Sequence, residues 1–216
     1  MPDVEYEKKA AAEAAAELVE DGCTVGLGTG STVAHFLPAL AHRKLEVRCV
    51  ATSEETENAA RGLGLRVEPF DRLERLDIAI DGADQVDPAG WLVKGGGGAH
   101  TREKIAAAAA DRFVVIVSSD KLVDKLAPPV PLELLVYGAA ATVRALRHVV
   151  LRDVPASPDG GLIADYVGEV GDPAALASRL AGTPGVVEHG LFPPALVSEI
   201  LVGRGSAVER VGGRRS

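Results

Sequence analysis

Hydrophobic positions in the first half of the chain follow two alternating spacings. Short apolar runs, such as Thr24–Leu27 and Phe113–Val117, are typical of buried strands. Between them lie longer segments, such as Thr32–His42, in which apolar residues return every three or four positions, as on one face of a helix. Strands that alternate with helices pair in parallel, so the pattern predicts an α/β fold with a mostly parallel sheet. The predicted helices are Val4–Val19, Thr32–His42, Ser53–Gly62 and Arg102–Asp111, and the predicted strands are Thr24–Leu27, Val47–Ala51, Arg66–Glu68, Asp77–Ile80 and Phe113–Val117.

The pattern changes after Asp124. Ala127–Pro131 is rich in proline and predicts a stiff joint. Beyond it the regular alternation ends, which predicts a smaller α+β unit of roughly 70 residues, and Ala207–Val211 could return to the first sheet. We therefore expect a first domain formed by residues 1–127 and 203–216, and a smaller α+β domain formed by residues 128–202. The elements predicted for the smaller domain are a strand at Leu132–Val136, a helix at Ala139–Leu146, two strands around Pro158–Gly161 and a helix at Pro173–Leu180.

Composition narrows the classes of function. A hydrophobic share of 47% is ordinary for a globular protein, and the formal net charge is −8. An acidic chain repels the phosphate backbone of nucleic acids, so we expect no nucleic-acid partner. The N-terminal segment is charged and Ala-rich, and no run of about 18 apolar residues occurs, so we expect neither a signal peptide nor a membrane span.

The two cysteines, Cys23 and Cys49, each lie inside an apolar run. They do not have C-x-x-C spacing, and no Cys/His pattern has the spacing of a zinc site. We therefore expect two buried thiols in a reducing cytoplasm, and no bound metal.

The segment Gly28–Thr32 follows the first predicted strand directly. Its glycines permit a sharp turn and a close backbone approach to a ligand, while its hydroxyl groups and the start of the next helix favour an anion. The segment fits a phosphate or hydroxyl cradle, although a tight turn with a Ser or Thr helix cap has the same pattern. Because residue 33 is Val and no Gly-Lys-Ser/Thr sequence occurs, we expect neither a dinucleotide-binding loop nor a P-loop.

Two carboxylates, Asp81 and Asp84, follow the predicted strand Asp77–Ile80. Acids this close perturb each other's pKa, and they suit acid–base chemistry or the binding of sugar hydroxyls. An Asp-Gly turn with solvated carboxylates is the structural alternative. A magnesium site has weaker support, because two aspartates alone are few ligands for that ion.

Four consecutive glycines, Gly95–Gly98, separate Lys94, at the end of an expected strand, from the next predicted helix. Such a segment is entropically costly to order, which favours a backbone that lies against a ligand, and Lys94 could hold an oxyanion or a phosphate there. Glu103 falls in the first helical turn, where the helix dipole favours the carboxylate that a general base needs. A flexible linker is the alternative. His100 shows no partner in the sequence and is interpreted as a loop histidine.

A last polar segment, Ser118–Lys121, follows the predicted strand Phe113–Val117. Lys121 would project from the carboxyl end of that strand toward the same crevice as the other loops, because ligands of α/β sheets bind at that edge. An ordinary surface lysine is the alternative.

Taken together and in order, these segments resemble the type A ribose-5-phosphate isomerases. The likeness covers nearly the whole chain, and several modest motifs at family-like spacing make it specific. The matching segments are Gly28–Thr32, Asp81–Asp84, Lys94–Gly98, Arg102–Lys104, Ser119–Lys121, Pro131–Glu133 and Gly185–Phe192.

The resemblance implies a Rossmann-like domain with a smaller α+β domain inserted near the C-terminus. It implies a cytoplasmic homodimer or homotetramer without a cofactor, whose partner is a small sugar phosphate. The implied reaction is the aldose–ketose interconversion of D-ribose 5-phosphate and D-ribulose 5-phosphate through an enediolate, a step of the non-oxidative pentose phosphate pathway.

The resemblance also implies roles for individual residues. Glu103 would carry a proton between C1 and C2, and Asp81 would assist opening of the furanose ring. Lys94 would stabilise the developing enediolate oxygen, and Asp84 would position sugar hydroxyls. The residues implied to bind substrate are Thr29, Gly30, Ser31, Thr32, Asp81, Gly82, Ala83, Asp84, Lys94, Gly95, Gly96, Gly97, Glu103 and Lys121.

Three positions depart from the family's pattern. Gln85 stands where the family often has Glu, which removes a charge near the site but no proposed catalytic group. Pro158–Gly161 replaces the family's Asp-Asn-Gly-Asn turn, and His189 stands where Asn is common. These departures leave the expected reaction unchanged.

The residues themselves agree with that reaction. An aldose–ketose shift needs one base that moves a proton between neighbouring carbons and an electrophile for the enediolate oxygen, and a carboxylate with an ammonium supplies both. Two other classes stay open on the residues alone. A sugar-phosphate sensor would keep the cradle but would need a DNA-binding module, and no basic helix-turn-helix precedes residue 24. An acyl-CoA transferase would use a glutamate as nucleophile, and an amino-sugar-phosphate deaminase could share the architecture.

Overall fold

The computed structural model of the chain describes residues 3–212, except the side chain of Arg72, and it divides into two compact units. Unit 1 comprises the residues up to Ala83, Arg102–Leu122, and the residues from Ala195 onward. Unit 2 comprises Asp84–Thr101 and Val123–Pro194. The expected domains differ from these units mainly in residues 84–101 and 195–202, and the pairing of the strands accounts for the difference.

Unit 1 is built on a seven-stranded sheet with the strand order β14-β13-β7-β4-β1-β2-β3. Neighbouring strands run parallel except for β14, which is antiparallel to β13. The α/β prediction is therefore confirmed, and so is the return of Ala207–Val211 to this sheet. The strands are β1 (Thr24–Leu27), β2 (Arg48–Ala51), β3 (Arg66–Val67), β4 (Leu76–Asp81), β7 (Ala110–Ser118), β13 (Glu199–Arg204) and β14 (Ala207–Val211).

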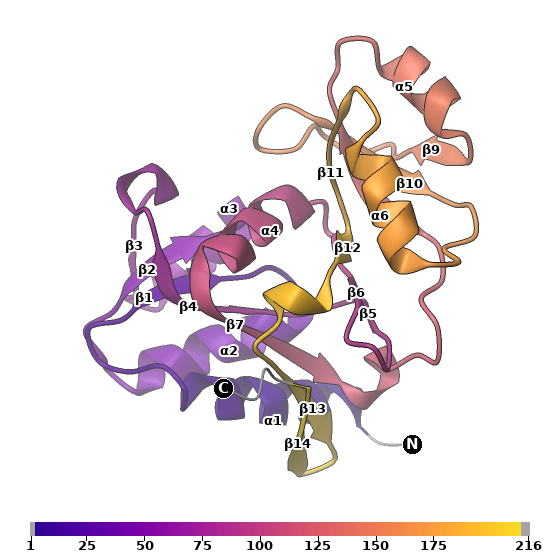
Figure 1. Ribbon diagram of the computed structural model, residues 1–216. Helices are drawn as coiled ribbons and strands as arrows, with labels where there is room; N and C mark the ends of the chain where they lie inside the picture. Colours follow the sequence, from indigo (N-terminus) through magenta and orange to yellow (C-terminus); the bar gives the residue numbers. More distant parts are fainter. Residues whose placement is uncertain (1–2, 213–216) are drawn as a thin grey trace. The chain divides into compact units, whose positions relative to one another are not determined.

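Helices cover both faces of this sheet (Figure 1). On one face α1 and α2 pack against the strands, and the fully buried alanines of α1, such as Ala11 and Ala15, let its backbone approach closely. On the other face Ala106 of α4 packs with Val50 and Leu76. The helices are α1 (Val4–Ala16), α2 (Ser31–His42), α3 (Glu54–Gly62) and α4 (His100–Ala109), with short 3-10 turns η1 (Phe70–Arg72), η2 (Ser119–Lys121) and η3 (Pro194–Leu196).

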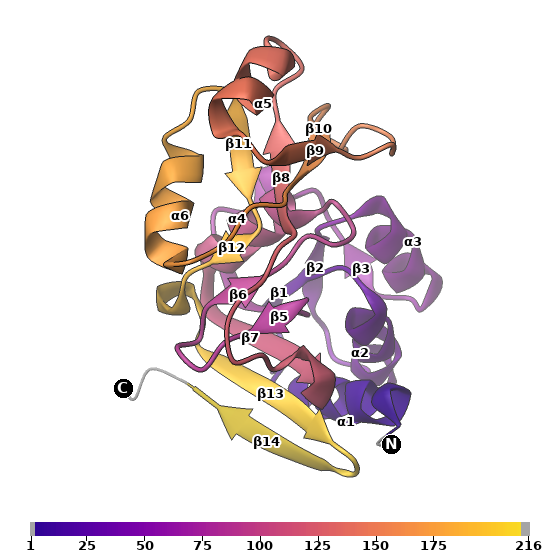
Figure 2. The same ribbon diagram turned by 90° about the vertical axis from the view of Figure 1, so that its right-hand side faces the viewer.

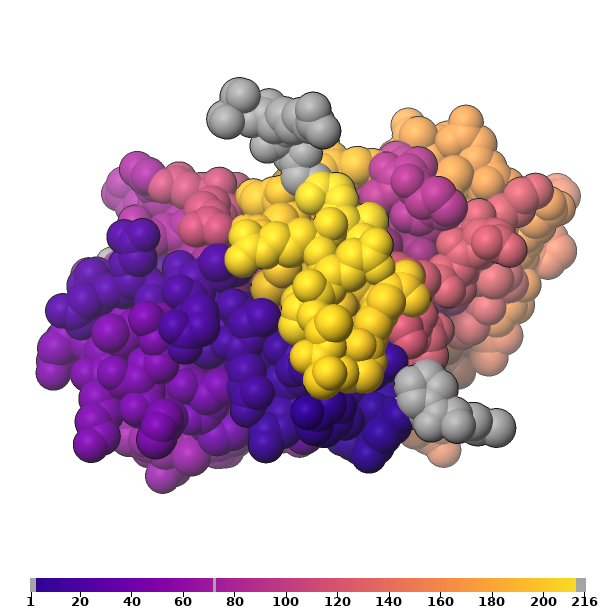
Figure 3. Space-filling model, turned by 90° about the horizontal axis from the view of Figure 1, so that it is seen from below, coloured from indigo at the N-terminus to yellow at the C-terminus, as the bar shows by residue number. Residues whose placement is uncertain are grey.

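The C-terminal hairpin of β13 and β14 lies beside the N-terminal helix α1 (Figure 3). Glu7 of α1 is only 2% exposed, and its carboxylate accepts hydrogen bonds from Ser119 N at 2.9 Å, Ser119 Oγ at 2.7 Å and Gly205 N at 3.0 Å. Burial opposes the ionisation of Glu7, but these hydrogen bonds outweigh it and lower its pKa. A lowered pKa means that Glu7 stabilises the fold above its unfolded-state pKa, and that this contribution is lost as the pH falls through the folded-state pKa.

Unit 2 contains two antiparallel sheets, one of four strands in the order β11-β8-β10-β9 and one of three in the order β12-β6-β5. Helices α5 and α6 pack on the four-stranded sheet through Leu146, Leu176 and Leu180 (Figure 2). The elements are β5 (Gln85–Val86), β6 (Leu92–Val93), β8 (Val130–Leu134), α5 (Ala139–Leu146), β9 (Val149–Leu151), β10 (Leu162–Tyr166), α6 (Pro173–Ala181), β11 (Val186–His189) and β12 (Leu191–Phe192).

Strand pairing explains why the expected domain boundaries differ from the units. The two-residue strands β5 and β6 pair with β12, which places residues 84–101 in unit 2. The expected boundary between residues 202 and 203 falls inside β13, which is hydrogen-bonded to β7 along its length and so belongs to unit 1. Strands of two residues are too short for a readable alternation, and the parallel pairing of β13 joins residues far apart in the sequence.

The burial of the two cysteines and the character of the helices bear on two expectations from the sequence. Cys49 is buried as expected, and burial raises the pKa of its thiol to about 12, whereas Cys23 is only half-buried. Within residues 3–212, every helix falls short of the length and apolar character that a bilayer-crossing segment needs.

Candidate active site

The predicted site residues are divided between the two units. Unit 1 contains Thr29–Thr32, Asp81–Ala83, Glu103 and Lys121. Unit 2 contains the others: Asp84, Lys94, Gly95, Gly96 and Gly97. Two connections of the chain join these sets, because Asp81 and Asp84 are near neighbours in sequence and α4 begins in unit 2 and carries Glu103 in unit 1. Each unit contributes its own set of contacts.

In unit 1, Asp81 fixes the loop Gly28–Thr32, which we call the β1–α2 loop. Asp81 ends β4 and is 3% exposed, and its Oδ1 accepts hydrogen bonds from Thr29 N at 3.1 Å and Gly82 N at 2.7 Å. A Cβ at Gly28 would lie 2.1 Å from the Asp81 carboxyl carbon, so a side chain cannot fit there. The close approach predicted for Gly28 is therefore made to a carboxylate of the protein itself.

The rest of this loop begins α2 without a side-chain cap. Gly30 occupies the N-cap position at φ 118°, a conformation that favours glycine, and Ser31 is the first helical residue. The alternative of a Ser or Thr cap is therefore wrong. The hydroxyl of Thr29 is 2.8 Å from that of Thr52, and Thr32 lies in the first turn. Amide groups at such a helix start, together with the helix dipole, favour an anion.

Glu103 lies in the first turn of α4, as predicted, and is only 4% exposed. The helix begins at His100, two residues before the predicted start. A carboxylate in the first turn is favoured by the positive end of the helix dipole. A glutamate so deeply buried is uncommon, because removing a charge from water is costly, and buried ionisable groups gather at functional sites.

His100 differs from its expected place. It is the first residue of α4 and is fully buried, so the interpretation as a loop histidine is wrong. Gly95, at φ 99°, packs directly under it, because a Cβ at Gly95 would lie 2.7 Å from the Cβ and Nδ1 of His100. The buried imidazole therefore leaves no room for a side chain at Gly95, one of the glycines that precede the helix.

In unit 2 the segment Gly95–Ala99, which we call the β6–α4 loop, is held by charged side chains. Gly96 N donates to Asp84 Oδ2 at 2.9 Å, and Gly98 N donates to the Gly95 carbonyl at 2.9 Å. Nη1 of Arg152 donates to the carbonyl oxygens of Gly95 at 3.3 Å and Gly96 at 2.8 Å. The alternative of a flexible linker is therefore wrong for this part of the loop.

Lys94 precedes this loop and is 2% exposed. Its backbone N donates to the Gly190 carbonyl at 2.8 Å, and its Nζ lies 5.5 Å from the centre of the Phe192 ring, within cation–π range. Asp84 N donates to the Val93 carbonyl at 2.8 Å, which places the exposed residue Asp84 beside the end of the same strand. A buried lysine and an exposed aspartate therefore both stand at the carboxyl end of β6.

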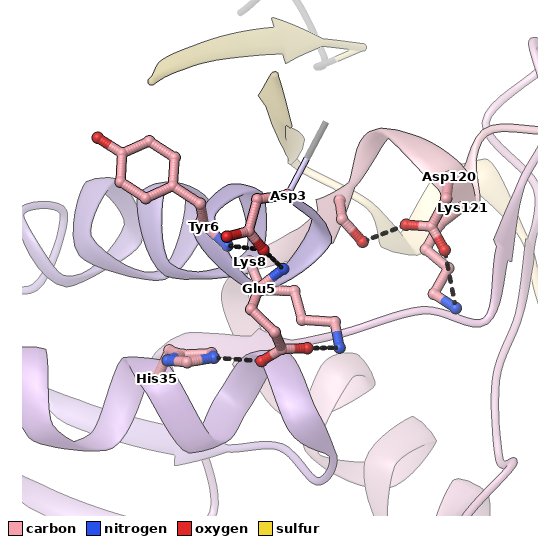
Figure 4. A network of polar contacts seen from close by, with 8 residues as sticks. Asp3, Glu5, Tyr6, Lys8, His35, Asp120 and Lys121 are labelled. Carbon is pink, nitrogen blue, oxygen red and sulfur yellow. Dashed lines mark hydrogen bonds and ion pairs between the residues drawn. The ribbon is translucent and has the colours of Figure 1, made fainter. Parts of the chain in front are cut away.

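Lys121 ends η2 in unit 1, with 34% of its side chain exposed. Figure 4 shows it beside Asp120, whose Oδ2 is 3.5 Å from its Nζ. Burial opposes the ionisation of Asp120, but the hydrogen bond from Ser118 and the charge of Lys121 outweigh it and lower the pKa of Asp120. Lys121 is therefore ion-paired with its neighbour in sequence, and it keeps a partly accessible ammonium.

Two residues that hold the predicted segments were not expected in such a role. Glu133 of β8, 2% exposed, accepts hydrogen bonds from the hydroxyls of Thr101 and Ser157, and Thr101 lies in the first turn of α4. A glutamate inside the apolar run Val130–Leu134 was a signal in the sequence that could have marked it. Arg152 had no signal, because its partners come from separate segments of the chain.

Two further features of the described residues concern metal binding and a surface groove. Among residues 3–212, no group of three His, Cys, Asp or Glu side chains is arranged to hold a metal ion. A groove of about 750 Å³ lies between α1 and α2, lined among others by Lys9, His35 and Arg43. None of the predicted site residues lines it.

Comparison with known proteins gives a consistent result. The family model of ribose 5-phosphate isomerase A (phosphoriboisomerase A) matches residues 48–207. A ribose-5-phosphate isomerase A of Natronomonas pharaonis is 44% identical over 221 residues, which cover 95% of this chain and 96% of the relative. Among solved structures, ribose 5 phosphate isomerase A from Neisseria gonorrhoeae superposes with a TM-score of 0.92 at 30% identity, covering 98% of each chain.

A further solved relative is a D-ribose-5-phosphate isomerase in complex with phospho-erythronic acid. It has a TM-score of 0.90 at 32% identity, covering 96% of this chain and 98% of that one. A family model that matches most of the chain and relatives similar over nearly their full length agree with each other and with the fold. The chain therefore belongs to the ribose 5-phosphate isomerase A family.

Proposed function

We propose that this chain interconverts D-ribose 5-phosphate and D-ribulose 5-phosphate through an enediolate. Membership of the family is the observation that carries the proposal, because the relatives are named for this substrate. One solved relative is in complex with phospho-erythronic acid, a phosphorylated four-carbon sugar acid. The carboxylate of such an acid places a negative charge on two neighbouring oxygens, as an enediolate does.

Glu103 is the proposed base. Its carboxylate takes the proton from C2 of the opened aldose, an enediolate forms, and the same carboxylate returns the proton to C1 of the ketose. The support is its place in the first turn of α4 and its low exposure of 4%. A buried base exchanges its proton slowly with water, which favours return of the same proton to substrate.

Lys94 is the proposed electrophile. An ammonium group held in a poorly hydrated place stabilises a developing oxyanion more strongly than one in water. The 2% exposure of Lys94 and its position over the Phe192 ring support this role. Asp84, at the end of the same strand, is exposed and suits the binding of sugar hydroxyls.

Asp81 is proposed to assist opening of the furanose ring by accepting the proton of the anomeric hydroxyl. Two backbone N–H groups on its Oδ1 fix the orientation of the carboxylate. We assign the phosphate group to the amide and hydroxyl groups of Thr29–Thr32 with Lys121, since an uncapped helix start and a cation both favour an anion. Gly82, Ala83 and Gly95–Gly97 complete the proposed substrate-binding set.

The decisive experiment is an isomerase assay of the purified full chain with ribose 5-phosphate, comparing wild type with Glu103→Gln. Loss of the base should lower kcat by roughly 10³-fold with little change in KM, since general base catalysis contributes on the order of 10²–10⁴. Glu7→Gln is the matched control for kcat, because Glu7 is equally buried near the start of a helix and its partners Ser119 and Gly205 are not among the proposed catalytic residues. It should lower thermal stability and leave kcat unchanged.

The activities of the wild type and of Glu103→Gln test the reaction and its base separately. An inactive wild-type protein would contradict the proposed reaction. An active wild type with an equally active Glu103→Gln would keep the reaction and remove Glu103 as its base.

We further propose that the protein acts in the cytoplasm, in the non-oxidative pentose phosphate pathway, as a homodimer or homotetramer. The oligomer has support in unit 2, where Leu135, Val136 and Tyr137 are all exposed and Tyr137 reaches 94%. Adjacent exposed apolar side chains of this kind are typical of an interface. Sedimentation equilibrium of the purified protein gives its mass, and a monomer at micromolar concentration would contradict the assembly.

A further inference from the structure

Arg152 follows β9 and forms a fork-to-fork ion pair with Asp165 of the neighbouring strand β10. Its Nε donates to Asp165 Oδ2 at 2.8 Å and its Nη2 donates to Asp165 Oδ1 at 2.6 Å. Each side chain is 19% exposed, and the Arg152 backbone N donates to the Ile163 carbonyl at 2.9 Å. The guanidinium is therefore fixed in position and direction by the four-stranded sheet.

The remaining donor group of this fork points at the β6–α4 loop. Nη1 of Arg152 donates to the carbonyls of Gly95 and Gly96, while Asp84 accepts from the Gly96 N–H. The peptide group that joins Gly95 to Gly96 is thus held at both ends, at its oxygen by a cation and at its N–H by an anion. The hydrogen bonds to Asp165, together with the charges of Asp165 and Asp84, outweigh the effect of burial and raise the pKa of Arg152, so the guanidinium stays charged.

These hydrogen bonds matter because the residues that they hold are glycines. A run of glycines has the largest backbone freedom of any sequence, so its peptide groups flip unless other groups hold them. In a trans peptide the C=O and the N–H point in opposite directions. With the Gly96 carbonyl directed at Arg152, the N–H of Gly97 in the same trans peptide must point away from the guanidinium.

We infer that Arg152, anchored by Asp165, is a positioning residue that orients the peptide groups of Gly95–Gly97 so that the Gly97 N–H is available as a fixed donor to substrate. The inference rests on the proposed function of this loop in binding the sugar phosphate. Arg152 itself does not touch substrate in this role. It raises the fraction of molecules whose loop is ready to bind, and the apparent affinity scales with that fraction.

The test compares Arg152→Met with Arg48→Met. Arg48 is a matched control, because it forms an equally bidentate pair with Glu68 at 2.7 and 3.0 Å in unit 1 and contacts no glycine loop. Both variants lose one ion pair and a similar aliphatic stem. Arg152→Met should lower kcat/KM by more than tenfold, whereas Arg48→Met should stay within twofold of wild type. Arg152→Lys, which keeps the charge but not the fork, should restore part of the loss.

A second readout does not depend on turnover. Amide hydrogen exchange of the ligand-free protein should show faster exchange at Gly96 and Gly98, whose amides are hydrogen-bonded within the loop, in Arg152→Met and no change there in Arg48→Met. If Arg152→Met does not fold, Asp165→Asn supplies the same comparison, since it weakens the anchor and should speed exchange of the same amides by a smaller factor.

The outcomes separate this inference from the proposed function. If the loop amides of Arg152→Met exchange at the wild-type rate, Arg152 does not orient the loop, whatever the activity of the variant. Wild-type kcat/KM in folded Arg152→Met would overturn its role in binding. A third outcome is possible: the loop amides exchange faster in Arg152→Met, but the wild-type protein does not isomerise ribose 5-phosphate. That outcome would support the orienting role of Arg152 and contradict the proposed reaction.

Discussion

The β1–α2 loop and the β6–α4 loop are both rich in glycine and both carry predicted substrate contacts, yet they are held in different ways. In the β1–α2 loop one buried carboxylate, Asp81, binds the backbone from within, and the start of α2 keeps an uncapped set of amide groups. In the β6–α4 loop an anion and a cation hold opposite ends of the peptide group that joins Gly95 to Gly96, Asp84 at its N–H and Arg152 at its carbonyl. The first loop is therefore fixed by hydrogen bonds to one buried carboxylate and by a close steric fit against it, and the second by two opposite charges.

This difference shows that a glycine near a site is not by itself a sign of ligand contact. Gly28 lies against Asp81, and Gly95 lies against His100, so each is required by a side chain of the protein. Gly30, in contrast, has open space where a side chain would be, and its positive φ alone favours glycine. The groups that we propose to face the ligand in both loops include backbone donors, whose direction is set by other residues.

The largest effect is expected for Gly28→Ala. The added Cβ would lie 2.1 Å from the Asp81 carboxyl carbon, so the carboxylate must move and the loop with it. We expect a loss of about 1–3 kcal/mol in the free energy of unfolding and of roughly 10²-fold in kcat/KM. Urea denaturation and steady-state kinetics measure both. Gly62→Ala, which meets no atom within 4 Å at the end of α3, is the control; it should leave kcat/KM unchanged and should not lower the free energy of unfolding, because alanine favours a helix more than glycine does.

An intermediate effect is expected for Ser31→Pro. Proline fits the first position of a helix and removes one backbone N–H, so α2 should form as before while the proposed phosphate cradle loses a donor. A hydrogen bond to a charged group contributes roughly 1.5–3 kcal/mol, which predicts a rise in KM of at least tenfold. Ser31→Ala keeps the N–H and separates the amide from the hydroxyl. An unchanged KM in Ser31→Pro would remove this helix start from the phosphate site.

The smallest effect is expected for Gly96→Ala. Its backbone does not have a positive φ, and the added Cβ would lie 3.1 Å from Asp84 Oδ1, so a shift of a few tenths of an ångström suffices. We expect a decrease of roughly threefold in kcat/KM, because a side chain at an exposed position changes energies by only about 0.5 kcal/mol. A decrease as large as that of Gly28→Ala would mean that the second loop is limited by steric fit as well, and the contrast between the loops would disappear.

Most of unit 1 could be predicted from the sequence because its strands are apolar runs between amphipathic helices. The pattern located β1, β2, β4 and β7 and their helices to within a few residues. It missed β5 and β12, which have two residues each, and it did not predict β13, whereas the strand that it placed before Lys94 is β6. Short strands carry no periodicity, and the neighbours of a parallel strand are distant in sequence.

For the site, the sequence determined which chemical groups stand at the ends of strands and at the starts of helices: Asp81, Lys94 and Glu103 are where the motifs placed them. Only the tertiary structure decided what holds them. The close approach of Gly28 to Asp81, the burial of His100 and the hydrogen bonds of Arg152 to the β6–α4 loop each depend on contacts that folding creates. Local sequence sets backbone preferences over a few residues, whereas the direction of a glycine peptide group is set by partners that folding brings from elsewhere.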